Sequence, residues 1–195
     1  MTPYGDVVAL PGRGSMMGNR GILHDDVRRI VRPWQVRRWI ACLLEFRGRR
    51  RSVMQPRRYT ELFFLDEATA LAAGHRPCAE CRNAEYKRFR SIWEEHFGER
   101  AGADAMDDRL HADRLEGKRK RTYRAQLGSL PDGTYVALDA TPWLVWDSKL
   151  YTWSDSGYSA SRPRHTRIEV EVLTPRALAA ILGAGYRPTI HPSAG

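Results

Sequence analysis

Residues 63–82 read FFLDEATALAAGHRPCAECR, and this stretch predicts the local fold more clearly than any other part of the chain. Asp66 is a good helix N-cap, and Glu67 favours the positive end of a helix dipole. Ala68–Ala73 are helix formers, and Gly74 predicts a left-handed stop. The stretch therefore predicts a strand, a short helix and then a turn that carries two cysteines.

The two cysteines of this turn are Cys78 and Cys81, spaced as C-x-x-C after Pro77. A tight turn of this kind lets both sulfurs face one metal ion at about 2.3 Å. The remaining cysteine, Cys42, lies in the apolar run 39–46, which predicts a strand. An odd number of cysteines with one C-x-x-C indicates a reducing compartment and not a disulfide framework. Thiolate ligands without a redox demand favour zinc, so we predict a Zn²⁺ site.

Outward from the motif, the chain alternates apolar runs with turn signals. Residues 59–65 predict a second strand, and residues 83–97 predict a second helix. Aromatic residues recur on that helix at spacings of three and four, which is typical of a buried stripe; a base-stacking platform is the alternative. Its members are Tyr86, Phe89, Trp93 and Phe97.

The C-terminal part of the chain predicts a small antiparallel β-rich unit that ends in a short helix over 175–182. Its strand-like runs are 135–138, 143–146, 150–153 and 168–173. The fold class expected is α+β, with a zinc-knuckle module of two strands and two helices followed by the β-rich unit. The predicted divisions are a zinc module over 1–98, a charged connector over 99–126 and the β-rich unit over 127–195, packed into one body.

Composition narrows the class of protein. The chain has 195 residues, with 32 Lys and Arg against 23 Asp and Glu, so its formal net charge is +9. Six Trp, eight Tyr and five Phe are too many for a disordered chain. No apolar run approaches the roughly 18–20 residues of a membrane span, and the first residues do not read as a signal peptide. We therefore expect a cytoplasmic protein whose basic charge favours nucleic acid as partner.

Two basic clusters are candidates for contact with phosphate groups. The planar fork of Arg suits bidentate phosphate contacts, and a run of Lys and Arg supplies salt-sensitive affinity; a solvated charged face is the alternative. The first cluster is Arg47, Arg49, Arg50, Arg51, Arg57 and Arg58, and the second is Lys118, Arg119, Lys120 and Arg121.

Over about residues 60–82 the chain resembles the zinc module of the Ada DNA-repair proteins. In that family a strand, a short alanine-rich helix and the series Gly-aromatic-Arg-Pro-Cys-x-x-Cys follow in this order. The resemblance implies a tetrahedral zinc site at a DNA-facing surface, where a zinc-bound cysteine of Ada accepts a methyl group from a phosphotriester. Cys78 and Cys81 match the last two family ligands, and Cys42 is a candidate for one of the first two.

The family spaces its first two ligands as C-x-x-x-C, and this spacing from Cys42 meets Arg38 on one side and Phe46 on the other. A fourth ligand must therefore come from elsewhere or be water. His24 is the first candidate and His111 the second, whereas His75 occupies the aromatic position of the family. Three thiolates with one water would make an open site of the catalytic type.

The function that we expect from the sequence is zinc-dependent binding of nucleic acid, with DNA as the expected partner, in repair or modification. A rival is a zinc enzyme acting on nucleic acid, of hydrolase, glycosylase or deaminase type; deaminases share the Pro-Cys-x-x-Cys pattern but need a Glu two residues after the first ligand. His111 and Asp113 are candidates for a general base and its carboxylate partner. A third reading is a structural zinc domain with a protein partner.

Overall fold

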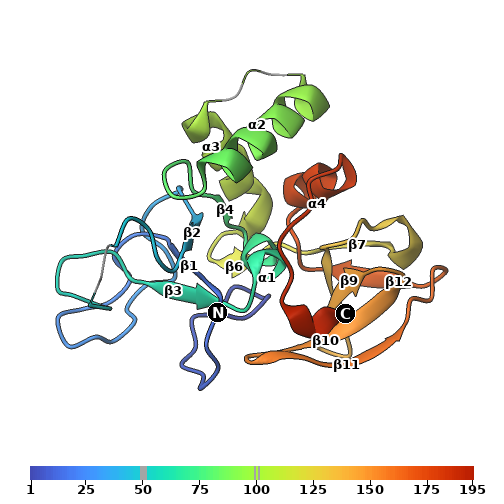
Figure 1. The fold of residues 1–195 in the computed structure, drawn as a ribbon, viewed down its shortest axis with the longest axis horizontal. Helices are drawn as coiled ribbons and strands as arrows, with labels where there is room; N and C mark the ends of the chain where they lie inside the picture. Colours follow the sequence, from blue (N-terminus) through green and yellow to red (C-terminus); the bar gives the residue numbers. More distant parts are fainter. Residues whose placement is uncertain (49–51, 99, 101) are drawn as a thin grey trace.

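The computed structural model describes residues 1–48, 52–98, 100 and 102–195 (Figure 1). It is a mixed α+β structure, as the predicted fold class requires at that level. The described residues form four α-helices, namely α1 (Glu67–Ala72), α2 (Asn83–Phe97), α3 (Ala103–Arg114) and α4 (Arg176–Gly183). The predicted boundaries of the second helix are those of α2, and α1 and α4 lie within a residue of their predicted positions.

The smaller sheet lies in the N-terminal part of the chain and holds the cysteine motif. Its order is β3-β1-β2-β4, with β1 antiparallel to β2 and β3, and β4 parallel to β2. The strands are β1 (Met16–Asn19), β2 (Ile40–Leu43), β3 (Leu62–Phe64) and β4 (Arg76–Pro77). The two predicted strands are present as β2 and β3, and the sheet contains two more, β1 and β4. β4 has only two residues and pairs with a strand distant in the sequence, so it leaves no alternation from which it could be predicted.

The larger sheet is antiparallel and has the order β11-β10-β9-β8-β12-β7. Its strands are β7 (Tyr123–Gln126), β8 (Tyr135–Leu138), β9 (Thr141–Trp146), β10 (Lys149–Ser154), β11 (Gly157–Pro163) and β12 (Glu169–Val172). The predicted connector over 99–126 supplies α3, the hairpin of β5 (Leu115–Glu116) with β6 (Arg119–Lys120), and β7. Part of that segment therefore belongs to the larger sheet.

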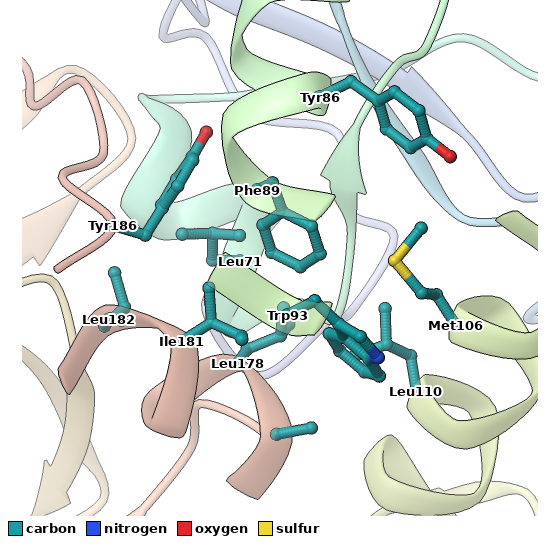
Figure 2. Packing of buried hydrophobic residues seen from close by; sticks show 11 residues of the cluster. Leu71, Tyr86, Phe89, Trp93, Met106, Leu110, Leu178, Ile181, Leu182 and Tyr186 are labelled. Carbon is teal, nitrogen blue, oxygen red and sulfur yellow. The ribbon is translucent and has the colours of Figure 1, made fainter. Parts of the chain in front are cut away.

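The aromatic stripe of α2 is core and not an exposed stacking platform. Tyr86, Phe89 and Trp93 are buried against α3 and α4 (Figure 2). Met106 of α3 and Ile181 of α4 belong to the same cluster. Because the cluster joins segments on both sides of residues 99–126, the three helices hold the N-terminal and C-terminal parts of the chain together.

Helix α1 lies between the two sheets (Figure 1) and contacts both. Its predicted N-cap forms, since an Asp66 carboxylate oxygen accepts from the Thr69 N–H at 2.8 Å. The other oxygen of Asp66 accepts from the Tyr158 hydroxyl at 2.6 Å and from the His191 N–H at 3.0 Å. The helix that precedes the cysteine turn is therefore fixed to β11 and to the C-terminal segment.

The residues just before the cysteine turn are also fixed. Gly74 ends the helix with a φ of +90°, and a Cβ there would lie 2.7 Å from the Arg114 side chain. The Arg76 guanidinium makes two hydrogen bonds, of 2.6 and 2.9 Å, to the Asp107 carboxylate of α3. Both side chains are almost fully buried, with relative exposures of 1 % and 2 %. This ion pair joins β4 to α3 directly before Cys78.

Candidate metal centre

Backbone pairing brings the three cysteines together. Cys42 lies on β2, and Cys78 follows the end of β4. The parallel register places Pro77 opposite Ala41, and the Cys78 N–H donates to the Ala41 carbonyl at 3.0 Å. Cys81 returns through the following turn, so the three sulfur atoms all lie within 4.8 Å of one another.

This spacing suits one tetrahedral ion. In a tetrahedral zinc site, sulfurs about 2.3 Å from the ion lie about 3.8 Å from each other. Small changes in the cysteine side-chain torsions would bring sulfurs that lie within 4.8 Å of one another to that separation. The prediction that the three cysteines converge is confirmed, and they are close enough to hold a metal ion. Among the described residues, no further His, Cys, Asp or Glu joins the group.

The C-x-x-C turn is held independently of any metal. The Arg82 N–H donates to the Cys78 carbonyl at 3.2 Å, and the Asn83 side-chain amide donates to the Ala79 carbonyl at 2.8 Å. The buried Arg82 guanidinium lies 2.8 Å from a Glu67 carboxylate oxygen on α1. The turn between the helix stop and α2 is thus preorganised to present two sulfurs.

The three thiols have unequal acidities. The pKa of Cys78 is lowered to about 5, because the Cys42 thiol donates to its sulfur and the backbone N–H groups of Cys81 and Glu80 point at it. The pKa of Cys42 is raised, first by this hydrogen bond to Cys78 and then by burial. Burial also raises the pKa of Cys81. The cluster therefore stabilises one thiolate at neutral pH, and a bound cation would favour loss of the other two protons.

A cavity of about 240 Å³ borders the three cysteines. Its other walls include Glu61, which is buried, and Glu80 of the C-x-x-C turn. A carboxylate oxygen of Glu61 accepts from the Met54 N–H at 2.8 Å. An ion held by the three sulfurs would therefore face a cavity with two carboxylates in its walls, which the sequence did not predict.

His24 does not complete the cluster. Its Nδ1 lies 2.6 Å from the Thr60 hydroxyl, and its Nε2 lies 3.2 Å from the Gln55 carbonyl. Both ring nitrogens thus have partners in Thr60 and Gln55, and His24 is not part of the cysteine group. The prediction of His24 as a metal ligand is not supported by this geometry. His75 packs, as expected, with its ring centroid 4.7 Å from that of Phe64.

His111 and Asp113 do not form the predicted acid–base pair. The His111 Nδ1 lies 3.1 Å from the Arg114 guanidinium, and its ring contacts Trp34 edge-on. The Asp113 carboxylate accepts from the Ala177 N–H in the first turn of α4. His111 and Asp113 are two residues apart on α3, so their side chains do not share a face of the helix. Asp113 therefore caps α4 and does not orient the imidazole of His111.

The basic clusters fall in two places. Arg47, Arg57 and Arg58 are exposed in the loop between β2 and β3, other residues of which line the 240 Å³ cavity. Arg49, Arg50 and Arg51 lie outside the described residues. The second cluster lies on and beside the β5–β6 hairpin: Lys118, Arg119 and Arg121 are exposed, and Lys120 is partly buried.

No helix in the described part of the chain is both long and apolar enough to cross a membrane. Comparisons with protein-family models, with curated proteins and with solved structures give no match to this chain.

Proposed function

We propose that this protein binds zinc through Cys42, Cys78 and Cys81 and binds nucleic acid, with DNA as the preferred partner, beside that site. The observation that carries the proposal is the approach of three sulfurs, two of them on a preorganised turn, to within 4.8 Å of one another. Three thiolates form a soft ligand set, which selects zinc over magnesium or calcium. The Ada-like order of helix, turn and cysteines supports a role in DNA repair or modification.

The nucleic-acid part of the proposal rests on where the basic residues lie. The loop between β2 and β3 carries Arg47, Arg57 and Arg58 and also lines the cavity beside the cysteines. Their exposed guanidinium groups would contact phosphates of a strand that passes the cavity mouth. Zinc would fix β2 relative to the C-x-x-C turn, and hence the start of this loop.

The test is binding of labelled DNA and RNA of the same sequence by fluorescence anisotropy, across a series of salt concentrations. We expect log affinity to fall linearly with log salt, and the Arg57→Gln/Arg58→Gln variant to reduce the slope by roughly 2, since each phosphate contact contributes about 0.9. Removal of zinc with a chelator will weaken binding. A matched control, Lys87→Gln/Arg90→Gln on the exposed face of α2, will leave the slope unchanged.

A flat salt response, or equal effects of the two double variants, would contradict the proposed nucleic-acid surface. If a chelator removes the metal but does not change the affinity for DNA, the zinc does not support DNA binding. That outcome would favour a structural zinc domain with a protein partner.

One observation favours the second candidate, a zinc enzyme that acts on nucleic acid. The cavity beside the cysteines brings the carboxylate of Glu61 into the same space as the three sulfurs, whereas Glu45, after Cys42 in the sequence, is exposed. A buried carboxylate in such a cavity is positioned to accept a proton from a bound water or substrate. Mass spectrometry of DNA and RNA incubated with the zinc-loaded protein will detect a product, and Glu61→Gln will remove it while zinc content is retained.

A further inference from the structure

A second, larger pocket lies at the other end of the small sheet. Its volume is about 630 Å³, within the range of small-molecule sites, and no residue lines both this pocket and the 240 Å³ cavity. Arg20 directly follows β1, and Trp39 directly precedes β2. The same two strands carry Met17 and Cys42, which line the 240 Å³ cavity. The two sites therefore share a sheet and face different spaces.

The lining of this pocket is strongly cationic. Its cations are Arg20, Arg32, Arg114, Lys118, Arg119 and Lys120, against one carboxylate, that of Asp6. Arg20 and Arg114 have relative exposures of only 2 % and 1 %. Buried arginines normally pair with a carboxylate, as Arg76 does with Asp107. Within residues 1–48, 52–98, 100 and 102–195, no carboxylate forms an ion pair with Arg20, Arg114 or Lys120.

Three of these cations converge on the carbonyl groups at the end of α1. Lys120 Nζ donates to the Ala72 carbonyl at 2.5 Å. Arg20 Nη2 donates to the carbonyl of the next residue at 3.1 Å, and Arg114 Nη1 to that of Gly74 at 2.8 Å. A helix C-terminus supplies only about half a negative charge, so it offsets a fraction of three positive charges. The Nε of Arg114 is buried and has no hydrogen-bond partner within the described chain.

Burial and repulsion between these cations lower their pKa values. Burial, together with the charges of Arg20 and Arg114, lowers the pKa of Lys120 to about 7. The pKa of Arg20 is lowered to about 9 by burial, and that of Arg114 to about 9 by burial and by the charge of Arg20. An anion beside these groups would favour their charged forms.

The pocket also has an aromatic wall. The Trp39 ring lies between two guanidinium groups, with the Arg20 Cζ 3.8 Å and the Arg114 Cζ 3.9 Å from its centroid. Trp34 lines the same pocket, is only partly buried, and contacts the His111 ring edge-on at 4.5 Å. Stacking thus fixes the cations, and a second indole remains for a planar group of a ligand.

We propose that this pocket binds the phosphate group of a nucleotide, with the phosphate against Arg20, Arg114 and Lys120 and the base against Trp34. A phosphate monoester carries close to two negative charges at neutral pH, which matches a site with several cations and one carboxylate. The volume accommodates a nucleoside monophosphate and exceeds what an inorganic anion fills. The proposal does not depend on the metal centre, because the two sites share no lining residue.

The test uses the full chain, with isothermal titration calorimetry and Trp fluorescence. We expect adenosine 5′-monophosphate to bind at least tenfold more tightly than adenosine, and inorganic phosphate to compete with it. Lys120→Met will lower the affinity for the monophosphate at least tenfold. Lys87→Met, which removes an exposed lysine of α2, will not change that affinity. Trp34→Leu will lower the affinity for the monophosphate and leave the affinity for inorganic phosphate unchanged.

Two arms separate the sources of the phosphate. If DNA with a 5′-phosphate binds at least tenfold more tightly than the same DNA with a 5′-hydroxyl, and more tightly than the monophosphate, the ligand is a strand end. If the monophosphate binds as tightly as the phosphorylated DNA, the ligand is a free nucleotide.

Equal binding of adenosine and its monophosphate by the wild-type chain, together with equal binding of the two DNAs, would overturn the proposal. This comparison needs no variant, so it holds even if Lys120→Met fails to fold. Loss of DNA affinity on Arg57→Gln/Arg58→Gln with retention of nucleotide binding would separate this pocket from the proposed nucleic-acid surface.

Discussion

Replacing Cys78 with serine will abolish stoichiometric metal binding and remove the stability that the metal supplies. Cys78 has the most acidic of the three thiols, and its sulfur interacts with both other cysteines. A ligand that binds only the folded chain stabilises it by about 4 kcal/mol when its free concentration is a thousandfold above Kd. We therefore expect the zinc-loaded wild type to unfold at a clearly higher temperature than Cys78→Ser, as measured by calorimetry with metal analysis of the same samples.

Ala79→Ser is the matched control for this substitution. Ala79 is exposed in the same turn, one residue away, and its side chain does not line the cavity beside the cysteines. This variant will keep the metal and the melting temperature of the wild type. If a chelator leaves the melting temperature of the wild type unchanged, the cluster supplies no metal-dependent stability and the interpretation fails.

Replacing Arg76 with methionine will cost about 3–5 kcal/mol of unfolding free energy, because it removes the buried cation that the Asp107 carboxylate faces. The exposed Arg38, 3.9 Å from the same carboxylate, then remains as a more distant partner. Arg76 and Asp107 make two hydrogen bonds to each other, and each has almost no exposed surface. The double variant Arg76→Met/Asp107→Leu will recover much of the loss, since no buried charge remains. Urea unfolding of the three proteins measures the difference, with Arg90→Met on the surface of α2 as control.

The pH dependence of Arg76→Met provides a further check. Burial already raises the pKa of Asp107 in the wild type, and loss of the Arg76 cation will raise it further. A carboxyl group whose pKa is higher in the folded state stabilises that state most at low pH, and this contribution is lost as pH rises through the folded pKa. The deficit of Arg76→Met will therefore shrink as pH falls from 7 toward 5. A deficit that grows on acidification would show that Asp107 is not the group left unpaired.

The sequence predicted best where local physics decides the structure. The α2 boundaries follow from a regular aromatic stripe that ends at Gly98, and α1 follows from an N-cap at Asp66 and a left-handed stop at Gly74. The sequence did not predict β4 or the place of β7 in the larger sheet. Those strands depend on partners 30 or more residues away, and pairing over such separations leaves no local periodicity.

The same division applies to the candidate sites. The convergence of Cys42 with the C-x-x-C turn followed from ligand chemistry, which restricts the arrangement to a few possibilities. His24 was predicted as a metal ligand from its residue type alone, and in the structure its ring nitrogens lie within hydrogen-bond distance of Thr60 and Gln55. The 630 Å³ cationic pocket was not predicted, because arginines are expected at the surface and only the tertiary structure buries Arg20 and Arg114 together.

The most direct test of the metal centre is metal analysis of the reduced, purified protein combined with X-ray absorption at the zinc edge. We expect one zinc per chain, with three sulfur atoms in its first coordination shell at about 2.3 Å. A reduced protein without stoichiometric metal, or a zinc shell that contains no sulfur, would contradict it.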